Sequence, residues 1–496
     1  MKGSSNLIIS PNFNGVQNLE ELVFARCSNL RKLHPSIGKL KKLKLLDLGW
    51  CSELTSLPDK FEIASLMILD LTYCLKVKNL VCLPNTICYL TLLNNLNLSG
   101  CSQFKKLPED LGNMVSLKEL DLGGTAIKEL PSSVQFLSGL TSLVLEDCKN
   151  FVRLPSTICS LKSLRKINFL RCSKFDKLPN DFGNITSLVE LNLSGTAIEE
   201  LPSSVEFLIG LKFLLLEDCK NFVPLPRTIF SLGSLSVLFL SRCPKFVNLE
   251  NFGNLKHVTW LSLEGTAIEV LPSSIGHMAA LILLYLKDCK NLVCLPNTIC
   301  NLKKLGKFDV TGCSKITNLP ENLGNMESLS ELLLGGTAIK ELHSSTIRLK
   351  WLNTVSFKGC QLSSSSLTSM TTSGEIDLSD CNLSAIPSGF LSGIGGFSTR
   401  MFHLRGIDLV FLPSFSQFSN LTYLHLNGCK SLRSLLIIPS NVYFICLDNC
   451  TSLERLLVPP NDITVRCFNC FKLAYYIESL SNIFQVSLSL ISTCVF

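Results

Sequence analysis

A nine-residue pattern of leucines that ends in cysteine or threonine constrains the fold of this chain more than any other feature. It reads "LKLLDLGWC" up to Cys51 and "LTSLVLEDC" up to Cys148. The step is 24 residues from Cys27 to Cys51 and 23 from Thr125 to Cys148. Apolar and polar residues alternate at the end of the pattern, as in a strand that buries one face. A unit this short cannot bury that face alone, so successive units must stack.

The pattern L-x-x-L-x-L-x-x-C is the signature of leucine-rich repeats. It predicts an α/β solenoid over residues 1–473, a horseshoe of about 20 repeats with a parallel β-sheet on its concave side. The other half of each repeat contains phrases such as "LPSTI", in which Pro155 fixes φ and removes a hydrogen-bond donor. We therefore expect irregular or 3-10 structure on the convex side.

Three repeats form a larger block of about 71 residues. The phrase "GTAIKELPSSV" begins at Gly124, and its threonine recurs at Thr125, Thr196, Thr266 and Thr337, with gaps of 71, 70 and 71. Duplication explains this period. We interpret the threonine as a structural residue rather than a working site, because it occupies the slot that cysteine fills elsewhere. Its hydroxyl is expected to reach backbone groups of the next coil.

Cysteine usage predicts a reducing compartment. The chain has 23 cysteines, and 15 of them occupy the one slot at the end of the leucine pattern. Buried free cysteine behaves as a small apolar residue, and so many unpaired thiols favour the cytoplasm, with the nucleus as a second location. Cys467 and Cys470 mimic half of a zinc site, but no second pair follows. We expect no metal.

Catalytic motifs are absent from the sequence. It has neither a G-x-x-x-x-G-K-[ST] loop nor a G-x-S-x-G elbow, and its six histidines are scattered without a pairing motif. The net charge of +7 is spread over interleaved acids and bases, unlike a nucleic-acid-binding stripe. We therefore predict no enzyme activity, no cofactor, no ATP or ADP binding, and neither nucleic acid nor a small molecule as ligand.

The repeat wording also resembles a known family. "NLEELVFARC", the "LPSSI" turn, the "GTAI" unit and "NCTSLERL" from Asn449 are similar to the leucine-rich repeat region of plant intracellular nucleotide-binding immune receptors. The resemblance is strongest to receptors with a Toll/interleukin-1-receptor-like domain, and it extends over about residues 7 to 473. It implies a role in defence against pathogens. The N-terminal domains of such receptors do not precede these repeats, so we expect a fragment, a truncated product or a shortened relative.

Residues 474–496 form an apolar tail that does not resemble the domain after the repeats in that family. We expect a truncated or non-native end. The stretch from Ile483 to Phe496 is shorter than the roughly 20 residues that a membrane span needs, so no span is predicted.

A candidate partner site lies on four successive strands. The x positions of L-x-x-L-x-L face the concave side and are polar in most repeats, but between residues 211 and 286 they turn apolar. We expect one contiguous patch about 15 Å across, bordered by charges, as in protein contact sites. Its predicted residues are Phe213, Leu215, Val237, Phe239, Trp260, Ile282, Leu283 and Tyr285, with Glu217, Asp218, Arg242 and Lys287 at the border. Drift within a duplicated array is the alternative explanation.

The predicted function is protein recognition in plant innate immunity. The partner would be a pathogen effector, or an autoinhibitory or nucleotide-binding domain of a longer receptor. An alternative is an adaptor that presents substrates to an enzyme complex such as a ubiquitin ligase, which would need a docking motif that the first 18 residues cannot hold. An extracellular receptor fragment would need a signal peptide, and "MKGSSNLIIS" lacks the apolar core of one.

Overall fold

The structure is a computed structural model of the chain. It describes residues 1–55, 57–58, 63–74, 83–223, 225–247, 249–250, 252–363, 374–383, 399–412, 415, 418–436, 438–457 and 463–473. The predicted tail, 474–496, lies outside the described residues. The chain divides into two compact units, Met1–Phe246 and Val247–Phe496, and each is described by itself.

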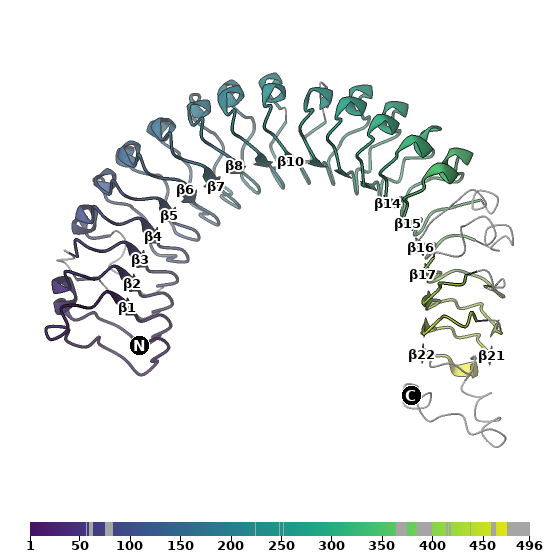
Figure 1. Cartoon of the computed structure of the whole chain (residues 1–496), viewed down its shortest axis with the longest axis horizontal. Helices are drawn as coiled ribbons and strands as arrows, with labels where there is room; N and C mark the ends of the chain where they lie inside the picture. Colours follow the sequence, from purple (N-terminus) through teal and green to yellow (C-terminus); the bar gives the residue numbers. More distant parts are fainter. Residues whose placement is uncertain are drawn as a thin grey trace, which may run out of the picture. The chain divides into compact units, whose positions relative to one another are not determined.

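The first unit is a ladder of short parallel strands that pair in chain order (Figure 1). A 3-10 turn precedes most of these strands on the other side of the coil. The strands are β1 (Glu21–Val23), β2 (Leu45–Asp47), β3 (Ile68–Asp70), β4 (Asn95–Asn97), β5 (Glu119–Asp121), β6 (Ser142–Val144), β7 (Lys166–Asn168), β8 (Glu190–Asn192), β9 (Phe213–Leu215) and β10 (Val237–Phe239). The turns are η1 (Pro35–Lys39), η2 (Asn85–Tyr89), η3 (Leu111–Asn113), η4 (Ser132–Phe136), η5 (Ser156–Ser160), η6 (Phe182–Asn184), η7 (Ser203–Phe207) and η8 (Arg227–Ser231).

The second unit repeats this construction, and its strands are also parallel. The main strands are β11 (Trp260–Ser262), β12 (Leu283–Tyr285), β13 (Lys307–Asp309), β14 (Glu331–Leu333), β15 (Thr354–Ser356), β16 (Glu375–Asp377), β17 (Met401–His403), β18 (Tyr423–His425), β20 (Phe444–Cys446) and β22 (Thr464–Arg466). A separate pair joins β19 (Ser434–Leu435) to β21 (Arg455–Leu456). The 3-10 turns are η9 (Phe252–Asn254), η10 (Ser273–His277), η11 (Asn297–Asn301), η12 (Leu323–Asn325) and η13 (Ser344–Arg348).

The leucines of the pattern form the core of each coil. Leu46, in the middle of β2, and Leu48 after it are fully buried, while Leu45 and Asp47 on either side of Leu46 are half-exposed. Buried phenylalanines pack between neighbouring coils; the ring of Phe151 lies 5.9 Å, centroid to centroid, from the ring of Phe169 in the next coil. The predicted fold, a leucine-rich repeat solenoid with parallel strands and 3-10 turns, is confirmed.

The cysteines at the end of the leucine pattern form a ladder, in which the thiol bonds to the coil before it. The thiol of Cys148 donates to the carbonyl oxygen of Leu122 in the preceding coil, with Sγ and O 3.0 Å apart. Threonine in the same slot bonds differently from our expectation. The Thr125 hydroxyl donates to Leu122 in its own coil at 2.7 Å, and reaches the next coil through the Cys148 sulfur at 3.4 Å. The hydroxyl has a single O–H, and that donor is already used within its own turn. The described cysteines are all free, and only Cys294 among them is exposed.

The residue just before each ladder side chain has a left-handed backbone. Glycine takes this position in some coils, as at Gly124 with φ of 68°. Other coils place bulky residues there, such as Trp50 with φ of 63° and Tyr73 with φ of 55°. A left-handed backbone is uncommon for such residues. The Trp50 and Tyr73 rings stack with centroids 4.3 Å apart. The two residues with a left-handed backbone therefore contact each other across adjacent coils.

Candidate protein-binding surface

The part of the predicted patch in the first unit lies on β9 and β10. Parallel register places Phe213 beside Val237 and Leu215 beside Phe239. Phe213 is 40% exposed, and Leu215 and Phe239 are half-buried. Val237 is only 9% exposed, so the prediction that it contributes an outward apolar surface is wrong. Its partner in register on the adjacent strand is the larger Phe213.

The part in the second unit lies on β11 and β12. Trp260 pairs with Leu283, and Ser262 pairs with Tyr285. The Trp260 ring, 36% exposed, lies 6.0 Å from the Tyr285 ring, centroid to centroid. Ile282, just before β12, is 44% exposed, and Leu283 and Tyr285 are half-buried. The strand register inferred from the sequence therefore holds in both units, whereas the continuity of the patch from one unit to the other stays a prediction.

The Lys307 side chain lies next to the aromatic pair of Trp260 and Tyr285. The Lys307 ammonium lies 5.6 Å from the centroid of the Tyr285 ring and 2.7 Å from a Glu331 carboxylate oxygen. The hydrogen bond to Glu331 raises the pKa of Lys307 above its usual value. Lys307 therefore stays charged and fixed beside Tyr285, and the face of this unit combines aromatic surface with positive charge.

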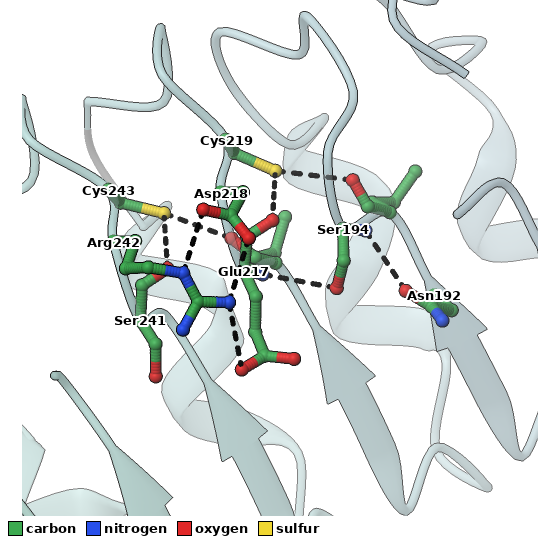
Figure 2. Close-up of polar contacts among 10 residues, drawn as sticks. Asn192, Ser194, Glu217, Asp218, Cys219, Ser241, Arg242 and Cys243 are labelled. Carbon is green, nitrogen blue, oxygen red and sulfur yellow. Dashed lines mark hydrogen bonds and ion pairs between the residues drawn. The ribbon is translucent and has the colours of Figure 1, made fainter. Parts of the chain in front are cut away.

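The predicted border charges of the first unit form an ion-pair cluster after the strands (Figure 2). The Arg242 guanidinium donates from Nε to Asp218 Oδ1 at 2.8 Å and from Nη2 to Asp218 Oδ2 at 2.7 Å. Glu217 lies 3.9 Å from the same guanidinium, and its backbone amide donates to the Ser194 hydroxyl at 3.1 Å. The hydrogen bond from Arg242 lowers the pKa of Asp218, so this pair stays ionised at neutral pH. Lys287, the remaining border residue, is exposed in the second unit.

Another cluster lies on β16, β17 and β18, where the sequence suggested only scattered histidines. The His403 and His425 rings stack with centroids 4.6 Å apart, a contact that no sequence motif indicated. His403 Nε2 lies 3.0 Å from Glu375 Oε1. Burial lowers the pKa of both imidazoles, that of His425 to about 4. Both rings are therefore neutral near pH 7. Parallel register places these two histidines opposite each other, but the repeats here are too irregular for sequence alone to fix that register.

In the part of the chain that the structure describes, no three side chains of histidine, cysteine, aspartate or glutamate converge in a way that could hold a metal ion. Over the same residues, no helix has the length and apolar character to cross a membrane.

The fold, with its cysteine ladder, is that of a leucine-rich repeat solenoid. A family model described as "Leucine-rich repeat region" matches residues 62–175 and 230–332. Among solved structures, the chain resembles that of the Toll–Spätzle complex from Drosophila, with a TM-score of 0.60, 16% identity and coverage of 90% of this chain and 56% of that one. It also resembles the functional domain of InlJ from Listeria monocytogenes, which includes a cysteine ladder, with a TM-score of 0.51, 22% identity and coverage of 68% and 67%.

The curated relatives of the chain include plant disease resistance proteins, as the resemblance of the sequence implied. TMV resistance protein N from Nicotiana glutinosa is 34% identical over 311 residues, which is 61% of this chain and 24% of that protein. Protein SUPPRESSOR OF npr1-1, CONSTITUTIVE 1 from Arabidopsis thaliana is 28% identical over 459 residues, or 84% of this chain and 30% of that protein. The chain thus spans less than a third of the length of these two relatives.

Proposed function

We propose that this chain is the protein-recognition part of a plant immune receptor. Its outward strand residues would bind a pathogen effector, or another domain of the same receptor, and the receptor would act in the cytoplasm. The similarity to plant disease resistance proteins supports the immune role. The buried free thiols support a reducing compartment.

The observation that carries the proposal is the change from polar to apolar residues on the outward strand positions. Lys166 on β7 and Glu190 on β8 form an ion pair with Nζ and Oε1 2.9 Å apart, which is ordinary for a solvated surface. Phe213 follows on β9, and Trp260 and Tyr285 occupy the equivalent face of the second unit. Partly exposed aromatic side chains on a rigid sheet are the residues that most often dominate binding energy.

Site-specific photo-crosslinking in plant leaf cells tests the proposal. A photoreactive phenylalanine analogue replaces Phe213 or Trp260, and mass spectrometry identifies the captured proteins. The control places the analogue at Phe136 on η4, which is 61% exposed but lies on the side of the coil opposite the strand. We expect the same protein to crosslink at both strand positions and not at Phe136.

The pair of substitutions Phe213→Asp and Trp260→Asp then tests whether the contact supplies the affinity. Both side chains are at least 36% exposed, so the folded state should tolerate them. Binding of the captured protein should fall by at least about tenfold, with unfolding unchanged in circular dichroism. Equal crosslinking from Phe136, or full binding by the double variant, contradicts the proposal.

A further inference from the structure

The repeated block offers an internal comparison at the edge of the strand face. Asp147, Asp218 and Asp288 occur at equivalent positions, 71 and 70 residues apart, each just before a ladder cysteine. All three have a left-handed backbone, with φ of 58°, 55° and 58°. The next coil places Arg171 after Asp147 and Arg242 after Asp218 in the corresponding position.

In the first two blocks the aspartate holds a guanidinium in the same way. Arg171 donates from Nε to Asp147 Oδ1 at 2.8 Å and from Nη2 to Asp147 Oδ2 at 2.7 Å. Arg242 repeats both distances on Asp218, as Figure 2 shows. Two parallel hydrogen bonds of this kind select arginine over lysine because the planar guanidinium matches the carboxylate. The turn is thus built to bind an arginine side chain.

In the third block the arginine is missing. Its position is occupied by Gly312, with φ of 78°, and the Asp288 carboxylate lies where a side chain of residue 312 would begin, with Cγ 3.2 Å from the expected Cβ. Among the described residues, no cation lies within ion-pair distance of Asp288. Asp380 is likewise followed in the next coil by a glycine, Gly406, at the equivalent position, but Lys358 lies 3.9 Å from the Asp380 carboxylate. Asp288 therefore has the backbone of the arginine-binding turn but, among the described residues, no arginine beside it.

The surroundings of Asp288 match an arginine supplied by another molecule. Asp288 follows β12, whose last residue, Tyr285, belongs to the aromatic pair with Trp260. A guanidinium stacks on such rings as well as pairing with carboxylate. In the first two blocks Glu146 and Glu217 also pair with the arginine, at 2.9 Å and 3.9 Å. Lys287 takes their place in the third block, so Asp288 alone would hold the incoming arginine there, and an acidic residue beside that arginine would meet a cation.

We infer that Asp288 is the docking point for an arginine side chain of a protein partner, which takes the place that Arg171 and Arg242 fill from within the chain. This inference rests on the proposed function and specifies the chemistry of its partner. An acidic residue next to that arginine would pair with Lys287.

The substitution Gly312→Arg tests the inference by supplying the arginine internally. Arg171 and Arg242 adopt the same left-handed conformation with φ of 60° and 57°, so the backbone accepts the change, and only the Asp288 carboxylate must rotate. Asp288→Asn removes the charge instead. The matched control is Gly336→Arg. Gly336 is the equivalent residue of the next coil, with φ of 68°, and its neighbour at the equivalent position of the preceding coil is Gly312 rather than an aspartate.

The probe is a library of random peptides displayed on phage and selected on the full chain. We expect the selected peptides to be enriched in arginine over lysine. Their affinity should fall by about tenfold or more in Gly312→Arg and in Asp288→Asn, and remain unchanged in Gly336→Arg. Circular dichroism confirms that the variants are folded.

Selected peptides without arginine enrichment, unchanged binding by Gly312→Arg, or a selection that yields no binder would each overturn the inference. Peptides that bind Gly312→Arg and Asp288→Asn but not the double variant Phe213→Asp with Trp260→Asp overturn the arginine site and leave the proposed function standing. Peptides that bind all of these variants count against both.

Discussion

The substitution Gly183→Ala should destabilise the chain far more than glycine-to-alanine changes usually do. Gly183 lies in the middle of η6 and is buried against η7 of the next coil. A Cβ at residue 183 would overlap the carbonyl oxygen of Ser204 and lie 2.6 Å from its carbonyl carbon. Because backbone rather than a flexible side chain blocks the methyl group, the two coils must move apart.

The magnitude follows from three contributions. Overpacking of this kind costs about 1–3 kcal/mol. Separation of the coils also weakens the hydrogen bond from the Gly183 amide to the Ser204 hydroxyl, 3.1 Å long, which contributes about 1 kcal/mol. Alanine restricts the unfolded chain and returns about 0.4–1 kcal/mol. We expect a net loss of about 2–3 kcal/mol in the free energy of unfolding.

Urea unfolding followed by circular dichroism measures this loss. The matched control is Gly233→Ala, because a Cβ at residue 233 meets no atom within 4 Å and the backbone there is not left-handed. The control should stay within about 0.5 kcal/mol of the parent chain. If Gly183→Ala is as stable as Gly233→Ala, the close packing of η6 on η7 does not set the spacing of the coils, and the reasoning is refuted.

Three further predictions concern the cysteines and the threonines that share the ladder slot. Burial raises the pKa of the Cys51 thiol from 9.0 to about 12 and that of Cys159 to about 11. The unfolded chain therefore ionises first, and stability should fall above about pH 9 by ~1.4 kcal/mol per pH unit for each such thiol, seen as a falling urea midpoint; a midpoint constant to about pH 10 would contradict this. Iodoacetamide should label Cys294 first among the described cysteines of the native protein, and many native disulfides would refute the reducing assignment. Thr196→Val should cost about 1 kcal/mol in thermal unfolding, because the hydroxyl donates to the Leu193 carbonyl at 2.7 Å, and no loss would show that this bond is dispensable.

The sequence predicted the parts of the fold that depend on period alone. The spacing of leucines identified the strands, and the alternation within "LKLLDL" placed Leu46 inside and Asp47 outside. The same alternation identified Phe213 and Trp260 as outward residues of the candidate site. These results follow from the geometry of a strand, in which side chains point to opposite faces in turn.

Contacts between coils could not be predicted in the same way. Val237 occupies an outward position by alternation, yet it is only 9% exposed, because burial depends also on neighbouring side chains in the sheet. The bidentate pair of Asp218 with Arg242 requires the left-handed turn that precedes each cysteine, and "EDC" and "SRC" do not reveal that turn by composition. The position just before the ladder side chain is glycine in some repeats and aspartate or arginine in others. This variation was the one signal in the sequence that could have indicated the left-handed turn. The stacking of His403 on His425 depends on register in irregular repeats, which the leucine pattern does not determine.

The block of about 71 residues has a consequence for how such a chain can change length. Cys148 and Cys219, equivalent residues of two blocks, donate to the carbonyl oxygens of Leu122 and Leu193 in the same way. Equivalent coils of the two blocks therefore pack on equivalent surfaces of the preceding coil. Each coil packs only on its neighbours. Recombination between two blocks would therefore delete or add a whole block and join surfaces that already fit. The chain would still fold, and the outward strand residues would be brought into new combinations on an unchanged scaffold.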